Sequence, residues 1–305
     1  MKIVFVVNNK NNRFKKVLPK LEQYARQANI GSVQFHHTQR KQHAIDLTHQ
    51  AVTEGCDVII AVGGDGTLHE VINGLLQSSL PASAYPAVGL LPQGSANDFA
   101  RTAGLSSSIE ALFQLIRSNS TRPIDLGKIY LHDTQESRYF INIASLGLGP
   151  EVVQGLERSS SWFGPGFQYF QQIIKTFFRY TKKTIRCSSN NWTWEGKLLQ
   201  MAVANGRFFG NAICIAPEAQ LSDGQLQLAL FGDLSIWDYL RNIGKLKKGI
   251  KIAHPQVHYH TAKEVRVESS DACGIEADGE YVGLVPATFS ILPNAIRFVM
   301  PSNTD

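Results

Sequence analysis

An apolar run in this sequence leads directly into a glycine-rich loop, and this limits the choice of folds more than any other feature. Asp57–Val62 reads DVIIAV, a β-branched, apolar pattern that predicts a central strand of a parallel sheet. The loop Gly63–Thr67 reads GGDGT, and a helical pattern follows over Leu68–Leu76. Ligands of open α/β sheets bind at the carboxyl ends of the strands, so this succession predicts a binding site.

The chemistry of this loop suits a phosphate group. Glycines let the backbone approach a phosphate closely, the helix N-terminus offers unpaired N–H groups, and Thr67 adds a hydroxyl. Asp65 would repel a phosphate unless a divalent cation, or water on one, lies between them. No Gly-Lys-Ser/Thr follows, so the loop is not a Walker A motif. A tight strand–helix turn without a ligand is the alternative.

A second loop of this kind follows the next predicted strand, Ala87–Leu91. Leu91–Arg101 reads LPQGSANDFAR, in which Gly94 allows a turn and Ser95 can donate a hydrogen bond to a phosphate. Asn97 and Asp98 stand before the next helix and could act simply as helix caps. Because neighbouring parallel strands end at the same edge of a sheet, we expect this loop to converge with Gly63–Thr67.

The pattern of elements divides the chain near residue 125. Strand and helix patterns alternate before that point, which predicts an α/β domain over residues 1–125. Strand patterns dominate residues 126–292 and predict a mainly antiparallel β domain, interrupted by helices near Phe167–Tyr180 and Ser235–Lys248. The segment 293–305 is expected to pack back on the first domain. The other strand candidates are Ile3–Val7, Val33–His37, Gly127–Leu131, Tyr139–Ala144, Leu198–Ala204, Gln225–Phe231, Val265–Glu268 and Thr288–Leu292.

Two acidic turns lie in the predicted β domain. Ile275–Val282 reads IEADGEYV, and its Asp278-Gly279 dipeptide predicts a hairpin turn that leaves Glu280 either as an exposed strand residue or as a catalytic carboxylate. Asp223-Gly224 likewise predicts a turn into a strand.

These motifs, in their order along the chain, resemble the diacylglycerol-kinase catalytic family. They are GGDGT, LPQGSANDFAR, Asp125-Leu126-Gly127, APEAQLSDGQLQL and Asp278-Gly279-Glu280. The chain looks most like bacterial lipid kinases of the diacylglycerol and phosphatidylglycerol type, with sphingosine and ceramide kinases as more distant relatives. The resemblance implies an α/β N-terminal domain with a parallel sheet, as in phosphofructokinase and NAD kinase, and a mainly antiparallel β-sandwich C-terminal domain.

The resemblance also implies how nucleotide would be bound. ATP would bind between the domains, at positions matching Asn8, Thr38, Gly64, Asp65, Gly66, Thr67, Leu68, His69, Glu70, Ser95 and Asn97. The segment Asn8–Asn12 departs from the Asn-Pro-x-x-Gly-like segment that the family often has, and Asn8 alone is kept from it as a contact.

Catalytic and metal-binding roles follow from the same resemblance. Glu280 would be the general base that takes the proton of the lipid hydroxyl, supported by Asp278, and Asp65 would act through magnesium and the nucleotide. Mg²⁺ would be bound by the Gln220 carbonyl, the Asp223 carboxylate and the Gln225 carbonyl, with Asp98 and Asp125 as further metal-associated carboxylates.

Charge and hydropathy bear on the partners. The net charge of +5 and pI near 9.0 favour an acidic partner, such as nucleotide phosphate, an anionic membrane or nucleic acid. No RNP, zinc or helix-turn-helix pattern is present, so nucleic acid is not expected. The initial MKIVFVV is too short for a signal peptide, and no stretch is long enough for a transmembrane helix. We therefore expect a cytoplasmic protein that meets its lipid as a peripheral protein at the inner membrane surface.

The predicted helix Phe167–Tyr180 is a candidate for that contact. It carries an aromatic and aliphatic stripe beside Lys175, Arg179 and Lys182, which suits either a membrane interface or core packing. The stripe consists of Phe167, Phe170, Ile174 and Phe177. The oligomeric state stays open, with a homodimer as one alternative.

The sequence thus predicts a Mg-ATP-dependent lipid kinase. An NAD kinase shares the GGDGT loop and is the main alternative, although LPQGSANDFAR and the Asp-Gly-Glu turn argue against it. A non-catalytic lipid- or nucleotide-binding relative is the other alternative, and the intact Asp65, Asp98, Asp278 and Glu280 argue against that.

Overall fold

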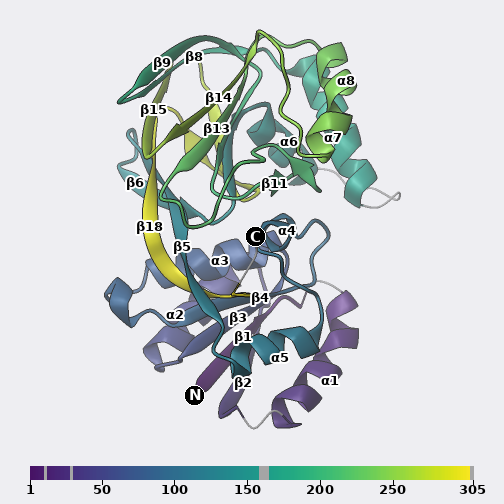
Figure 1. Cartoon of the computed structure of the whole chain (residues 1–305), viewed down its shortest axis with the longest axis vertical. Helices are drawn as coiled ribbons and strands as arrows, with labels where there is room; N and C mark the ends of the chain where they lie inside the picture. Colours follow the sequence, from purple (N-terminus) through teal and green to yellow (C-terminus); the bar gives the residue numbers. More distant parts are fainter. Residues whose placement is uncertain (10–11, 28–29, 158–164, 303–305) are drawn as a thin grey trace. The chain divides into compact units, whose positions relative to one another are not determined.

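The structure is a computed structural model that describes residues 1–9, 12–27, 30–157 and 165–302, with the side chains of residues 12–16, 157 and 165–170 outside the description. The chain forms two compact units (Figure 1). The first unit comprises Met1–Ile124 and the chain from Asn294 onward, and the second comprises Asp125–Pro293. The division falls inside strands β5 (Thr121–Leu131) and β18 (Ala287–Val299).

The first unit is an α/β fold around a parallel sheet. Its strands lie in the order β2-β1-β3-β4 with parallel pairing throughout, and Phe298 of β18 pairs with Val88 of β4. The strands are β1 (Lys2–Val7), β2 (Ser32–His37), β3 (Val58–Gly63) and β4 (Ala87–Pro92). The helices are α1 (Asn12–Gln27), α2 (His43–Thr53), α3 (Asp65–Leu76), α4 (Asp98–Thr102) and α5 (Ile109–Arg117), with a 3₁₀ turn at Ala82–Ala84.

Burial on both faces explains why the central strands of this unit are continuously apolar. All residues of β3 and β4 are buried, as expected for parallel strands covered by helices. The Phe5 ring of β1 stacks on Phe35 and Phe113, with centroids 5.1 and 6.1 Å apart. Helix α5 begins at the cap Ser108, whose hydroxyl accepts a hydrogen bond from the Ala111 N–H, and its apolar face joins the same core.

The second unit contains two antiparallel sheets. One has the order β14-β13-β10-β7-β16-β17 and is called the central sheet here; the other runs from β18 through β15 and β8 to β9, with β5 and β6 paired beside β18. Their strands are β6 (Glu136–Phe140), β7 (Ile143–Gly147), β8 (Lys183–Ser189), β9 (Trp192–Leu198), β10 (Gln200–Ala204), β13 (Leu226–Phe231), β14 (Val257–Ala262), β15 (Glu264–Ser269), β16 (Gly274–Ala277) and β17 (Glu280–Leu284). A short ribbon, β11 (Phe208–Phe209) and β12 (Ile213–Cys214), and helices α6 (Leu148–Glu157), α7 (Pro165–Arg179) and α8 (Ile236–Lys247) complete the unit.

The central sheet has hydrophobic cores on both faces. Met201 and Val203 of β10 pack with residues of the other sheet, such as Val265 and Phe289, and this forms the interior of a β-sandwich. The alternate residue Ala202 points to the opposite face, where the core includes residues of α6, α7 and α8. The period-2 alternation of a strand places neighbouring residues on opposite faces, so every residue from Met201 to Ala204 is buried.

The structure confirms the predicted fold class, an α/β domain and an antiparallel β-sandwich, but two local predictions were wrong. The predicted strand Tyr139–Ala144 is divided between β6 and β7, because the amides of Ile141, Asn142 and Ile143 donate to the Asp278 carboxylate. Helix α3 begins at Asp65 rather than Leu68, so most of the GGDGT loop forms the first helical turn.

Helices α6, α7 and α8 lie near one another in the second unit (Figure 1). Helix α7 buries Ile173 and Thr176, whereas Lys175 and Arg179 are exposed and Phe178 is 73% exposed. The side chains of Phe167 and Phe170, half of the predicted stripe, lie outside the described residues, and Phe177 packs against the helix-covered core. Among the described residues, no helix has the length and apolar character needed to cross a bilayer.

Candidate active site

In the first unit, the two predicted phosphate loops lie directly against each other. β3 ends at Gly63 and α3 follows at once, while β4 ends at Pro92 and the loop from Gln93 leads to α4. The Gln93 N–H donates to the Gly63 carbonyl at 2.7 Å. A Cβ on Gly64 would lie 2.9 Å from the Gly94 Cα, so glycine at both positions is required for this approach.

The Asp65 carboxylate connects the loops. Its two oxygens accept hydrogen bonds from the N–H groups of Asp98 and Phe99, at 3.1 and 3.0 Å. Asp65 therefore stabilises the N-terminus of α4 from another helix, a capping function that sequence inspection did not reveal. Asn97 has a left-handed backbone (φ 53°), and its side-chain oxygen accepts from the Gly94 N–H at 2.9 Å, which fixes the second loop.

The remaining predicted nucleotide residues surround the start of α3 and the end of β1. The Asn8 amide donates to the Thr67 hydroxyl at 3.0 Å, and the Thr38 hydroxyl accepts from the Asn9 N–H at 3.3 Å. Both Glu70 oxygens accept from backbone N–H groups at the start of α2, those of Gln42 and Ala44, at 3.0 Å each.

These predicted contacts differ in what they expose to a ligand. Ser95 is exposed at the tip of the second loop. A Cβ on Gly66 would meet no atom within 4 Å, so the space beside this backbone is open. The Leu68 side chain is fully buried, and its N–H, like that of Thr67, donates to the Gly64 carbonyl at 3.1 Å. His69 is half-buried on α3. The backbone at Asp65 and Gly66, the open space beside Gly66 and the Thr67 and Ser95 hydroxyls form a site suited to a phosphate chain.

In the second unit, Asp278 holds the acidic hairpin in place. β16 and β17 pair with Ala277 opposite Glu280, and Asp278 and Gly279 both have positive φ (50° and 88°), as a type I′ turn requires. The Asp278 carboxylate accepts from the N–H groups of Ile141, Asn142 and Ile143 at 2.9–3.1 Å. Glu280 follows as the first residue of β17 and is half-buried.

Beneath this turn lies a buried carboxylate that the sequence analysis missed. Glu276 is 4% exposed; one of its oxygens accepts from the Ser145 hydroxyl at 2.7 Å and the other from the Gly279 N–H at 2.8 Å. An acidic residue within the apolar strand GIEA was the available signal. Glu276 and Asp278 together fix the backbone on both sides of the turn that precedes Glu280.

The other acidic turn brings Asp125 and Asp223 together. Asp125 is fully buried, its carboxylate accepts from the Gly224 N–H at 2.7 Å, and its own N–H donates to the Leu221 carbonyl at 2.6 Å. Partial burial, and the negative charge of Asp125, raise the pKa of the Asp223 carboxyl above its usual value. The Gln225 N–H donates to Asp223 at 2.9 Å, and Gln220 lies exposed on the same segment.

A hard divalent cation fits this turn. Two carboxylates that repel each other, with backbone carbonyls available on the same segment, form the oxygen donor set that such an ion prefers. Within the described residues no cluster of three or more His, Cys, Asp or Glu side chains has metal-binding geometry, so a cation here would also need carbonyl and water ligands.

The fold and these loops define a two-unit protein, with an α/β unit that carries two paired glycine-containing loops and a β-sandwich unit. Residues 2–129 match the diacylglycerol kinase catalytic domain, and residues 143–300 match the YegS C-terminal NAD kinase beta sandwich-like domain. The chain therefore belongs to the family of diacylglycerol kinase-like lipid kinases that combine these domains.

Curated relatives agree with this assignment. The chain is 26% identical over 302 residues to a diacylglycerol kinase of Staphylococcus carnosus, covering 99% of this chain and 95% of that protein. It is 28% identical to a diacylglycerol kinase of Bacillus subtilis, covering 84% and 82%. It is 29% identical to a probable lipid kinase YegS-like of Stenotrophomonas maltophilia, covering 83% and 82%.

A solved structure supports the fold. The crystal structure of a putative diacylglycerol kinase from Bacillus anthracis superposes with a TM-score of 0.79 at 22% identity, over 99% of this chain and 98% of that one.

Proposed function

We propose that this protein transfers the γ-phosphate of ATP to a hydroxyl group of a membrane lipid, with diacylglycerol and phosphatidylglycerol as the leading acceptors. The observation that carries the proposal is the paired loop of the first unit, in which Asp65 holds the α4 N-terminus next to the start of α3. Membership in a lipid-kinase family directs this phosphate site toward phosphoryl transfer.

The first unit binds the nucleotide. Phosphate oxygens accept from the backbone N–H groups of Gly64, Asp65 and Gly66 and from the Thr67 and Ser95 hydroxyls, because the backbone at Gly66 is open. Asn8 orients the Thr67 hydroxyl, and Thr38 lies beside Asn9 at the end of β1. Asp65, Asn97 and Glu70 act indirectly, since their side chains hold the loops and the α2 N-terminus in position.

The second unit supplies the base for the acceptor. A lipid hydroxyl must lose its proton as its oxygen forms a bond to the γ-phosphorus and the bond to the β-phosphate oxygen breaks. Glu280 takes that proton, and Asp278 and Glu276 hold the turn that precedes it. Rigid support of this kind matters because a catalytic carboxylate must be held close to its productive geometry.

Magnesium is the metal that this activity uses. The Asp125 and Asp223 carboxylates with the Gln220 and Gln225 carbonyls hold one ion in the second unit, and Asp98 is a further candidate ligand in the first. When bound with the nucleotide, magnesium neutralises phosphate charge and so lowers the electrostatic cost of attack.

The protein meets its lipid at the cytoplasmic face of a membrane, to which it binds as a peripheral protein. The exposed Lys175, Arg179 and Phe178 of α7 and the 65% exposed Trp237 of α8 provide basic and aromatic side chains for that contact.

Transfer of labelled γ-phosphate from ATP to a panel of acceptors tests the proposal. The panel contains diacylglycerol, phosphatidylglycerol, sphingosine and NAD, each with and without magnesium. We expect magnesium-dependent label in one of the glycerolipids and none in NAD. Label in NAD alone would identify a soluble-metabolite kinase, and no transfer to any lipid would contradict the proposal.

A further inference from the structure

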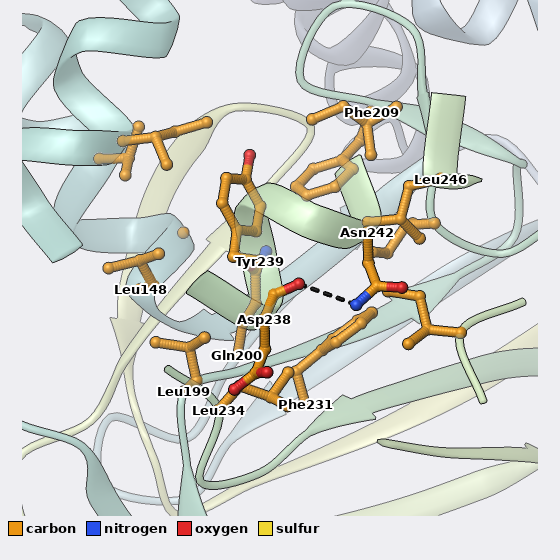
Figure 2. A pocket seen from close by; sticks show the side chains of 16 residues that line it. Leu148, Leu199, Gln200, Phe209, Phe231, Leu234, Asp238, Tyr239, Asn242 and Leu246 are labelled. Atoms are coloured by element: carbon orange, nitrogen blue, oxygen red, sulfur yellow. Dashed lines mark hydrogen bonds between the residues drawn. The ribbon is translucent and has the colours of Figure 1, made fainter. Parts of the chain in front are cut away.

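An apolar pocket lies within the second unit, between the central sheet and helices α6, α7 and α8 (Figure 2). Its volume is about 40 Å³. Since a cavity holds a water from roughly 10–15 Å³, this one has room for about three groups of water or methylene size. Its walls include Leu148 and Val152 of α6, Ile173 of α7, Leu246 of α8 and Phe231 of β13. A volume with such walls favours hydrocarbon over water.

Two polar atoms at this pocket have no hydrogen-bond partner among the described residues. They are Tyr239 Oη, on α8, and Gln200 Nε2, on β10, and both atoms are shielded from solvent. In the view of Figure 2, the Tyr239 side chain lies between Leu148 and Phe209. The Gln200 amide lies beside Gly149, where a Cβ would be in ordinary contact with Nε2 at 3.5 Å. A buried donor without an acceptor is costly, so a ligand that accepts from both atoms would remove that cost.

The charges at the pocket indicate that such a ligand is neutral. Asp238 is the charged side chain of its lining, and its carboxylate accepts from the Ser235 hydroxyl and N–H in the capping box of α8. No Lys or Arg belongs to this lining, all of which the structure describes. Burial raises the pKa of Tyr239 to about 12, so its hydroxyl stays protonated and can donate. A carboxylate or phosphate would therefore meet no positive charge here.

We propose that this pocket binds the ester end of a lipid acyl chain, with Tyr239 Oη and Gln200 Nε2 donating to the ester oxygens and the apolar walls holding the first methylene groups. The inference deepens the proposed function and rests on it only for the identity of the lipid as the phosphate acceptor. An acyl ester combines neutral acceptor oxygens with a hydrocarbon chain, which is the complement of this lining. Diacylglycerol and phosphatidylglycerol share that group, so the pocket would bind the acyl ester of either lipid and would not distinguish their head groups.

Calorimetric titration of the full chain without ATP tests this binding directly. The soluble probes are dihexanoylglycerol, dihexanoylphosphatidylglycerol and hexanoate. We expect both esters to bind and hexanoate to bind at least tenfold more weakly, because a carboxylate loses its solvation without gaining a cation. Because the pocket has room for only about three groups, affinity should rise by up to about fourfold per methylene of the bound chain from diacetyl- to dibutyrylglycerol and should level off at greater chain length. Equal binding of hexanoate would indicate a fatty-acid site, and no binding of any probe would indicate a solvent cavity; either result overturns the inference.

A matched pair of tyrosine variants separates ligand binding from folding. Tyr239→Phe removes a buried hydroxyl without a described partner, so the melting temperature should hold or rise while ester affinity falls about threefold to tenfold. Tyr180→Phe removes another such hydroxyl, but Tyr180 does not belong to the pocket lining, and ester affinity should not change. Equal affinities of wild type and both variants would overturn the inference. Gln200→Met provides a second variant with the same expectation as Tyr239→Phe.

Phosphate transfer distinguishes this inference from the proposed function. If wild type and Tyr239→Phe phosphorylate dihexanoylglycerol with equal KM, the kinase activity stands and the pocket assignment fails. If no lipid is phosphorylated but Tyr239→Phe still weakens ester binding, the pocket assignment stands and the kinase proposal fails. If the kinase proposal and the pocket assignment are both right, the KM for dihexanoylglycerol rises in Tyr239→Phe while kcat changes little, because the hydroxyl contacts the ester and not the reacting atoms.

Discussion

At the residue scale, the acidic side chains of this protein have unequal tasks. Asp65 and Asp278 accept hydrogen bonds from backbone amides of other segments, and Glu276 accepts from Ser145 and the Gly279 N–H. Asp125 and Asp223, by contrast, lie close together, and partial burial, with a smaller contribution from the Asp125 charge, raises the pKa of Asp223. Residue type and spacing indicated that Asp65 and Asp278 take part in catalysis. In the structure, their carboxylate oxygens accept hydrogen bonds from backbone N–H groups and so hold neighbouring segments in position.

Magnesium should stabilise the wild-type protein through Asp125 and Asp223. An ion at tenfold its Kd raises the free energy of unfolding by about 1.4 kcal/mol, since it binds only the folded state. Asp223→Ala should remove this response, whereas Asp133→Ala, at an exposed position of the same unit, should keep it. Thermal unfolding with and without magnesium measures both. A wild-type melting temperature that does not respond to magnesium would contradict the site.

The His260 side chain should make stability depend on pH. It stacks on Trp192 with ring centroids 4.3 Å apart, and burial and the neighbouring His258 lower its pKa below the usual 6.5. As pH falls below about 6.5, the unfolded chain binds a proton that the folded chain does not, so the free energy of unfolding decreases. Urea unfolding at several pH values should show a shallower decrease for His260→Gln than for wild type. An unchanged pH dependence in His260→Gln would contradict this assignment.

At the element scale, the sequence predicted regular segments better than the contacts between them. The run Asp57–Val62, the glycine loop and the following helix were recognised because hydrophobic period and glycine positions are local signals. The break between β6 and β7 depends on Asp278, more than 130 residues away in sequence, so no local pattern marked it. The convergence of the two predicted phosphate loops was expected from the order of the strands. The hydrogen bonds that Asp65 makes to α4 were not expected, because they too join segments that are distant in the sequence.

Two glycine substitutions test the paired loops. Gly66→Ala adds a methyl group to open space, so stability should hold or rise by up to about 1 kcal/mol, while ATP affinity should fall about tenfold. Gly94→Ala pushes a Cβ against Gly64 and should cost about 1–3 kcal/mol of stability. Thermal unfolding and ATP titration separate the two effects. Unchanged ATP affinity in Gly66→Ala would place the phosphates elsewhere.

At the scale of the whole molecule, a kinase with a membrane lipid as acceptor must reach a bilayer. The described helices include none that could cross one, and α7 instead exposes Lys175, Phe178 and Arg179. The predicted aromatic stripe does not match the exposed face of α7. Phe177 of that stripe packs against the core, whereas Phe178, outside the stripe, is exposed. Helical period alone does not say which face of an amphipathic helix meets the core.

Binding to anionic vesicles should weaken as ionic strength rises. Each basic residue near an anionic surface contributes about 1 kcal/mol, so changing both Lys175 and Arg179 to Glu should reduce vesicle affinity by about thirtyfold or more. The matched control changes Arg186 and Lys197, exposed on β8 and β9, to Glu and should bind nearly as wild type. Vesicle sedimentation at several salt concentrations measures this. Equal loss in both double variants would indicate a general charge effect and not a membrane face on α7.

Phosphoryl transfer by Glu280→Gln, compared with wild type, tests the central claim most directly. The measurement is labelled γ-phosphate transfer from ATP to dihexanoylglycerol or dihexanoylphosphatidylglycerol, with ATP affinity and melting temperature determined on the same protein. Because the amide keeps the shape of the side chain but cannot accept the proton, we expect kcat to fall about a hundredfold or more with ATP affinity and stability unchanged. Transfer by Glu280→Gln at the wild-type rate would contradict the account.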